Sequence, residues 1–402
     1  MSTDFGKEDE VAGTADLPMF RLGVGIWRAG SPVLLTLGTV GNALSAFVLS
    51  RPSIRSSPTA VCLAVLACTD LLVLYTGLLR QWLQHTFHVD VRHVSDAGCK
   101  IHTWLVYTSL DYSAWILLLL TVERVVYVWF PIRAKVGITH KSIVVALIVV
   151  LSVVMTINAH ILFGFSLEKR PTDPGQIRLV CGPKTEQYKR FIEVQWPWID
   201  LLVFCFIPFV VIVAGNTLIM KKLWRRRPFL TSSNSTSRSQ TSNVVMLMTL
   251  SAVFLITTSP VSIYLVMEVF LKENDSTERQ AEMFFWWSIV NILMYANNSL
   301  NFLFYCLSGT KFREELLRLW KCPQNTDTVK PRLETGHRRE NVPMDRVHSA
   351  PFWPNRSYSA ISVTTWIHIE RVGPHFFSCQ ILRTNEYKTF EGIWSMWLLL
   401  VY

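Results

Sequence analysis

Long apolar runs constrain the fold of this chain more than any other feature of its sequence. Each is about as long as the roughly 20 residues that a helix needs to cross the hydrocarbon core of a bilayer, about 30 Å thick. There are seven such runs, at residues 32–49, 59–83, 101–122, 142–165, 196–220, 243–271 and 284–307. Because a helix satisfies its own backbone hydrogen bonds in lipid, the runs predict an all-α membrane protein, a bundle of seven transmembrane helices.

The composition and charge of the chain agree with a membrane protein. Half of the 402 residues are apolar and only 17% are charged, whereas a soluble domain carries about 25% charged residues. The net charge of +10 comes mostly from basic residues in the loops between apolar runs, and the chain has no compact basic domain. The charge therefore favours membrane orientation over nucleic-acid binding.

The loops between the runs predict the orientation of the chain. The short loops after the first, third and fifth runs are basic and hold almost no acidic residues. Because basic loops stay in the cytoplasm, we expect a multi-pass protein with an extracellular N-terminus and a cytoplasmic tail. Cys99 and Cys181 then share the oxidising outer face, where a disulfide can persist.

The apolar runs divide the chain into four expected segments. Residues 1–28 form a polar extracellular N-terminus, residues 29–308 the bundle, residues 309–322 an amphipathic eighth helix on the membrane surface, and residues 323–402 a disordered cytoplasmic tail. The eighth helix contains FREELLRLW, which is too short to span lipid. The loop at residues 231–242 is rich in Ser and Thr, which makes it a candidate site for kinases and arrestin.

Several short motifs follow one another at fixed spacings along the predicted helices. They are Gly41-Asn42, LACTD ending at Asp70, Cys99 twenty-four residues before the triplet Glu123-Arg124-Val125, Pro131 seven residues beyond Arg124, Pro208, Phe254 with Pro260, NFLFY from Asn301 to Tyr305, and Phe312. Together they make residues 30–322 resemble the class A, rhodopsin-like G-protein-coupled receptors. NFLFY and the segment LYTGLLRQW resemble invertebrate neuropeptide receptors of the FMRFamide type.

The chain departs from that family pattern at several motif positions. Glu123 replaces the usual aspartate and keeps its charge, and Thr258 stands where the family often has a tryptophan. Phe302 replaces the proline of the seventh-helix motif. Val106 corresponds to the amine-binding aspartate of monoamine receptors, which argues against a monoamine ligand.

The resemblance also implies a ligand pocket in the outer half of the bundle. Arg80 is expected to meet a peptide carboxylate, an amide terminus or an acidic side chain, and Glu268 to meet a basic one. An aromatic and polar wall would come from Tyr107, Tyr264, Trp287, Asn291 and Tyr295. Plain packing is the alternative for each aromatic residue. Asp111 and Asp200 are further candidate pocket charges, with a buried pair or a water contact as the alternative.

A candidate ion site follows from the same resemblance, which places Asp70, Ser113, Asn297 and Asn301 around one water-filled pocket. A lone carboxylate with a hydroxyl and two amide oxygens suits a small hard cation such as sodium, which would stabilise the inactive state. The alternative is a hydrogen-bonded polar cluster with water and no ion. No other cofactor is expected.

The paired charges Glu123 and Arg124 end the third run, and the glutamate is predicted to be the resting partner of the arginine. The resemblance implies that activation frees Arg124 as the sixth helix swings outward on its proline bend. The swing would open a cavity for the C-terminal helix of a heterotrimeric G-protein α subunit. The other positions that the resemblance assigns to coupling are Phe254 and Pro260 in the sixth helix, Tyr305 in the seventh and Ile132 after the third.

Two positions are candidates for modification. Cys322 follows the amphipathic helix at the membrane surface, which suits S-palmitoylation, and an unmodified thiol is the alternative. Asn274 begins the sequon Asn-Asp-Ser in an outer loop and is a candidate for glycosylation.

These features predict a receptor of the plasma membrane that binds an extracellular ligand, a neuropeptide by resemblance, and activates heterotrimeric G proteins. A small-molecule chemosensory receptor of the same fold is one alternative. A seven-span ion-coupled transporter that uses Asp70 and Arg124 is another, but the two halves of the chain lack the internal similarity that many transporters have. An enzyme is not expected, because the sequence has no metal-ligand cluster and no nucleophile with a paired base.

Overall fold

A computed structural model describes residues 16–173, 176–226, 235–271, 276–308 and 310–320 of the chain. The predicted tail at residues 323–402 lies outside this range, as do Cys322 and Asn274. The described elements belong to one compact unit, which covers residues 1–326.

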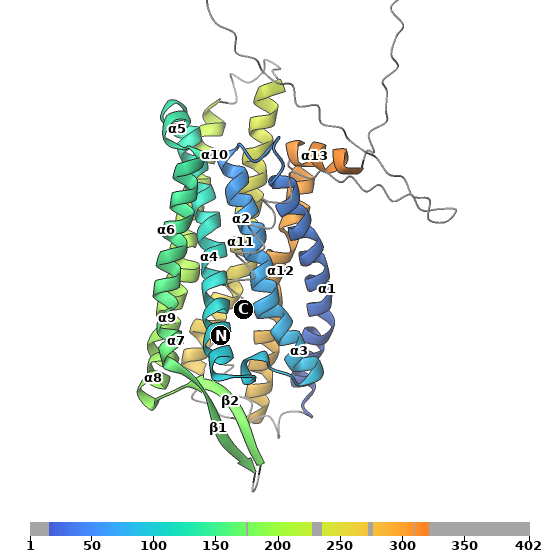
Figure 1. Cartoon of the computed structure of the whole chain (residues 1–402), viewed down its shortest axis with the longest axis vertical. Coiled ribbons are helices and arrows are strands. Elements are labelled where there is room, and N and C mark those ends of the chain that lie inside the picture. The colour runs from blue at the N-terminus through green and yellow to red at the C-terminus, as the bar shows by residue number, and fades with distance from the viewer. Residues whose placement is uncertain (1–15, 174–175, 227–234, 272–275, 309, 321–402) are drawn as a thin grey trace, which may run out of the picture. The chain divides into compact units, whose positions relative to one another are not determined.

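Seven helical rods form the bundle, as the apolar runs predict (Figure 1). They are α1 (Pro18–Leu49); α2 (Pro58–Val73) continued by η3 (Leu74–Leu78) and α3 (Leu79–Phe87); α4 (Asp96–Trp129); α6 (His140–Asn158) with α7 (His160–Gly164); α8 (Glu186–Arg190), η5 (Phe191–Gln195), α9 (Trp196–Asp200), η6 (Leu201–Phe206) and α10 (Ile207–Arg226); α11 (Ser235–Leu271); and α12 (Thr277–Ser308). Six of the rods contain a stretch that is long and apolar enough to cross a membrane. The seventh, α12, is 32 residues long but more polar, because it buries several asparagines inside the bundle.

Smaller elements cover the two ends of the bundle. They are η4 (Val91–His93), α5 (Pro131–Gly137), β1 (Phe165–Asp173), β2 (Gln176–Pro183) and α13 (Thr310–Trp320). The strands pair antiparallel, with Phe165 opposite Pro183 and Leu167 opposite Cys181. The hairpin lies at one end of the bundle, whereas α5 and α13 lie at the other (Figure 1).

Helix α4 is the central rod. It packs against α2, α6, α10 and α11. In its most apolar stretch 78% of the residues are buried, against 22% in the α6–α7 rod. The exposed residues of α6 include the large aliphatic side chains Val145, Ile148 and Val149. An apolar exposed face on a peripheral rod suits contact with lipid. Because α4 is buried among several helices, its side chains can take part in sites that those helices share.

Helix starts follow local sequence signals. Pro58 and Pro131 each occupy the first turn of a helix, where the missing N–H costs nothing. Thr139 and Ser142 form a reciprocal capping box at the start of α6, with hydrogen bonds of 3.1 and 2.9 Å. These signals explain why the loops before α2 and α6 end where they do.

The structure corrects two predicted boundaries. Helix α1 begins at Pro18 rather than at residue 32, so part of the expected polar segment 1–28 is helical. The cause is packing: Trp27 is fully buried, and its ring lies 5.3 Å from that of Trp287. Helix α11 begins at Ser235, so most of the Ser/Thr-rich loop at residues 231–242 continues the sixth rod as a helix.

Candidate functional site

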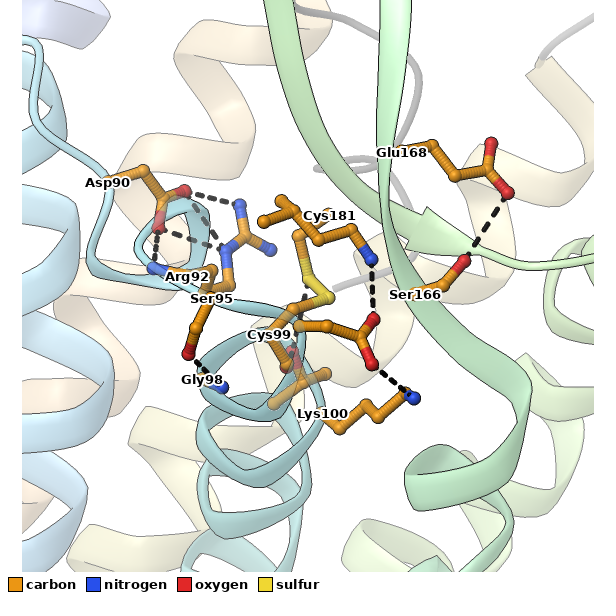
Figure 2. The surroundings of a disulfide bond; sticks show 12 residues. Asp90, Arg92, Ser95, Gly98, Cys99, Lys100, Ser166, Glu168 and Cys181 are labelled. Atoms are coloured by element: carbon orange, nitrogen blue, oxygen red, sulfur yellow. Dashed lines mark hydrogen bonds and ion pairs between the residues drawn. A yellow bond between two sulfur atoms is a disulfide. The ribbon is translucent and has the colours of Figure 1, made fainter.

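The hairpin end of the bundle is held by a disulfide between Cys99 and Cys181, as predicted. Cys99 lies in the first turn of α4 and Cys181 in β2, with their Cα atoms 5.6 Å apart. Both are buried. A second tie joins the other strand of the hairpin to the same turn of α4, because the backbone N–H of Leu167 in β1 donates to Asp96 at 3.0 Å. The hairpin is therefore fixed over the end of α4 (Figure 2).

Beside the disulfide, a buried ion cluster holds the segment between α3 and α4. Asp90 accepts a hydrogen bond from Arg80 at 3.1 Å and another from Arg92 at 2.6 Å (the Arg92 contact is drawn in Figure 2). Its other oxygen accepts from the Arg92 backbone N–H at 2.9 Å. Burial alone would raise the pKa of Asp90, but the charges of Arg80 and Arg92 and the Arg92 hydrogen bonds outweigh it and hold that pKa well below its usual range.

This cluster gives Arg80 a partner that the sequence did not suggest. Arg80 was expected to face a ligand, yet it is only 6% exposed and also donates to Gln84 at 2.9 Å. It does not line the cavity described next. A role for Arg80 in ligand binding stays a prediction.

A cavity lies between α4, α9, η6, α11 and α12. Its lining residues are Tyr107, Leu110, Asp111, Asp200, Phe204, Val261, Leu265, Asn291 and Met294. The space that admits a water-sized sphere is about 20 Å³, enough for about one water molecule. Tyr107 and Asn291 are the two predicted ligand residues that line it. The two carboxylates, named as candidate pocket charges, line it as well.

The other predicted wall residues lie in the packed interface between rods. Trp287 and Tyr295 both contact Trp27, with ring centroids 5.3 and 6.3 Å away. The Tyr264 hydroxyl donates to the Met283 carbonyl at 2.9 Å. These contacts match the packing alternative.

Glu268, predicted to meet a basic ligand group, is buried near the end of α11 and does not line the cavity. Trp27 was missed by sequence reasoning because it lies in a segment interpreted as a polar head. The one available signal was an isolated tryptophan next to the first apolar run.

Asp70 lies at the centre of a saturated polar cluster. One carboxylate oxygen accepts from Ser113 at 2.9 Å and from Asn298 at 2.7 Å, and the other accepts from Asn301 at 2.6 Å. The Asn42 side chain donates to the Asn298 carbonyl at 2.8 Å, which ties the Gly41-Asn42 motif to the cluster. The cluster thus joins α1, α2, α4 and α12.

The structure corrects one member of this predicted set, because Asn298, not Asn297, contacts Asp70. Successive helical residues point about 100° apart, so only one of the pair can face α2. The Oδ1 atom of Asn297 is buried without a hydrogen-bond partner among the described residues. The amides turn N–H groups toward the carboxylate, whereas sodium needs oxygen ligands. This arrangement matches the alternative of a hydrogen-bonded cluster, and the sodium site stays a prediction.

A threonine stands between the paired charges at the other end of α4. The Thr59 hydroxyl donates to Glu123 at 2.7 Å and accepts from Arg124 at 2.5 Å. No ion pair joins the two charges directly within the described residues, so Thr59 links Glu123 to its predicted partner Arg124. As neighbours on one helix they point in different directions, and the first turn of α2 passes between them.

The remaining predicted coupling residues lie in α5, α11, α12 and α13. Tyr305 is buried, its ring centroid lies 5.6 Å from that of Phe312, and its hydroxyl has no hydrogen-bond partner among the described residues. Phe254 is buried, and Pro260 lies inside α11. Ile132, in α5, is 82% exposed and free to enter a partner. Phe302 packs against Gly41, where an added Cβ would come within 2.8 Å of the Phe302 Cβ.

Comparison with known proteins assigns the family. A family model described as 7 transmembrane receptor (rhodopsin family) matches residues 41–305. The chain is 25% identical to cysteinyl leukotriene receptor 1 of Sus scrofa, over 76% of this chain and 87% of that one. It is 24% identical to the FMRFamide receptor of Drosophila melanogaster, over 71% and 52%, and 25% identical to growth hormone secretagogue receptor type 1 of Homo sapiens, over 71% and 78%.

This family match, together with the seven-helix bundle and its motifs, assigns the broad function. The chain is a multi-pass membrane receptor for an extracellular ligand, and it couples to G proteins. It belongs to the rhodopsin family of seven-transmembrane receptors.

Proposed function

We propose that the ligand is a neuropeptide and that the receptor works at the plasma membrane with its N-terminus outside. The observation that carries this proposal is the size and place of the cavity. Small-molecule pockets enclose about 300 to 1,000 Å³, whereas this cavity admits about one water. A ligand that inserts one end here and makes its other contacts at the surface, as a peptide does, fits that geometry.

Two further observations support a peptide. Among the relatives is a receptor named for FMRFamide, and the motif NFLFY of this chain resembles the seventh helix of such receptors. Val106, at the position of the monoamine-binding aspartate, is a buried apolar side chain. A lipid ligand is the second candidate, favoured by the similarity to a cysteinyl leukotriene receptor.

The proposed orientation is supported by where the disulfide lies. Disulfides persist on the oxidising side of a membrane, and Cys99 and Cys181 lie at the end of the bundle opposite α5 and α13 (Figure 1). The start of α1 reaches the same end, since Arg28 donates to the His85 carbonyl of α3 at 2.8 Å. An N-terminal epitope tag should therefore stain intact cells, and staining only after permeabilisation would reverse the orientation.

The ligand class is tested by a screen on cells that express the whole chain. Amidated neuropeptides, beginning with Phe-Met-Arg-Phe-amide, and cysteinyl leukotrienes are applied, and G-protein dissociation is recorded. Arg124→Ala, expressed equally at the surface, is the control for coupling. A peptide response that this control abolishes supports the proposal, whereas a response to leukotrienes alone replaces it with the lipid candidate.

A further inference from the structure

The polar lining of the cavity is unusual because its charged members are both acids. Asp111 comes from α4 and Asp200 from the end of α9, on different walls. Their charges are close enough to repel one another. No basic side chain is among the described lining residues. A buried carboxylate with no positive partner among the described residues is costly, so the buried Asp111 with the half-buried Asp200 beside it calls for an explanation.

Asp111 is only partly satisfied by the protein. It is 2% exposed, and Asn158 donates to its Oδ2 atom at 2.7 Å. The other Asn158 amide hydrogen goes to the Val154 carbonyl at 3.0 Å, so this asparagine has nothing more to donate. No other hydrogen bond reaches Asp111 within the described residues. Asp200 accepts none at all there.

An independent acceptor faces the same cavity from a third wall. Asn291 of α12 is 2% exposed, and its amide nitrogen donates to the Trp287 carbonyl at 2.8 Å. That bond turns the Oδ1 atom the other way, and Oδ1 has no hydrogen-bond partner among the described residues. Asn291 is neutral and does not belong to the acid pair, yet it offers the cavity a hydrogen-bond acceptor, as the two carboxylates do.

We propose that Asp111, Asp200 and Asn291 form a cation-binding subsite for a protonated amine or guanidinium group of the ligand. An ammonium group carries three N–H donors and a guanidinium five, and neither carries an acceptor. Either group would satisfy all three oxygens and neutralise the repulsion between the carboxylates. The subsite rests on the proposed function in one respect, namely that the cavity binds part of an extracellular ligand. The alternative explanation for the two acids is that their carboxylates share a proton and bind no ligand.

A probe of matched shape tests the subsite without any agonist. The purified whole receptor is heated with millimolar phenylbutylamine, phenylbutylguanidine or phenylbutanol, and its unfolding temperature is recorded. The charged probes should raise that temperature and the alcohol should not. Equal shifts with all three probes, or no shift with either cation, would overturn the subsite.

Matched variants place the effect at the three acceptors. In Asp111→Asn and in Asp200→Asn the dissociation constant of the amine should rise at least about tenfold. Asp200→Glu keeps the charge and should retain binding. Glu193→Gln, an exposed acid on η5 outside the cavity, should match the unmodified receptor. Undiminished amine binding by folded Asp111→Asn and Asp200→Asn receptors would refute the proposal.

A second arm distinguishes a peptide from a small amine as the source of the cation. Phe-Met-Arg-Phe-amide is compared with its citrulline analogue, which keeps the shape of arginine and removes its charge. If the peptide activates, the analogue should lose about tenfold or more in potency on the unmodified receptor and little on Asp200→Asn. The same loss on both would contradict the subsite. A silent peptide together with an amine-induced shift would support the subsite and reject the proposed neuropeptide.

Discussion

Two of the carboxylate sites in this bundle differ in how far hydrogen bonds satisfy their oxygens. Asp70 accepts three hydrogen bonds from Ser113, Asn298 and Asn301, so its charge is spread over donors from two other helices. Asp111 and Asp200 together accept one hydrogen bond within the described residues. A carboxylate whose oxygens all accept hydrogen bonds holds helices together, whereas a pair of carboxylates with few hydrogen bonds can still bind a donor from a ligand. The first arrangement suits a structural hub and the second a place for a ligand.

Asp90 extends this comparison to a carboxylate neutralised by charge. Replacing Asp90 with Ala leaves Arg80 and Arg92 buried without their carboxylate, so we expect the largest loss of unfolding free energy, about 4 kcal/mol. The measurement is thermal unfolding of the purified receptor. Lys100→Ala removes only an exposed ion pair with Asp96 and should cost less than about 1 kcal/mol. Similar losses in both variants would contradict the buried cluster.

The low pKa of Asp90 gives the same contact a pH dependence. The pKa is lower in the folded protein than in the unfolded chain, so the stabilisation is fully present above the unfolded value near 4 and is lost as pH falls below it. Unfolding temperatures of the unmodified receptor and Asp90→Ala should therefore converge below about pH 4. A constant difference down to pH 3 would show that the carboxylate charge does not matter.

Asp70→Ala tests the saturated site. The change leaves three buried donors without an acceptor, and we expect a loss of about 3 kcal/mol in unfolding free energy. Asn297→Ala is the matched control, because Asn297 neighbours the cluster but makes no hydrogen bond to Asp70. A smaller loss for Asp70→Ala than for Asn297→Ala would show that Asp70 is not a structural hub.

Thr59→Val probes Glu123, whose Oε2 atom is buried without a hydrogen-bond partner in the described residues. The change removes the hydroxyl between Glu123 and Arg124 and keeps the volume of the side chain. We expect the equilibrium to move toward the active state by about 1 kcal/mol, and basal G-protein dissociation to rise about fivefold. Glu123→Gln should raise it in the same direction. Unchanged basal signalling in both variants at normal surface expression would exclude this lock.

The smallest change in stability is expected at the unsaturated pair. Asp200→Asn removes a repulsive charge and leaves no donor without its acceptor, so the unfolding temperature should stay the same or rise slightly. The comparison with Asp70→Ala is made in the same assay. A loss at Asp200 as large as that at Asp70 would mean that both acids are structural.

The sequence by itself determined the rods, the disulfide and the family. Apolar length and helix starts are local properties, and the disulfide followed from two cysteines on the oxidising face together with the family resemblance. The motifs around Asp70, Arg124 and Tyr305 lie where the resemblance implied, near the contacts that it anticipated. These features survive because they do not depend on how far each helix is rotated about its axis.

Only the tertiary structure decided which side chains meet. A helix turns about 100° per residue, so a small rotation replaces Asn297 with Asn298 beside Asp70 and brings Thr59 between two neighbouring charges. Arg80 finds Asp90 because the chain folds back after α3, and Trp27 extends α1 because α12 buries it. The meeting of Asp111, Asp200 and Asn291 joins three separate rods. Such contacts depend on the packing of distant segments, which no local pattern records.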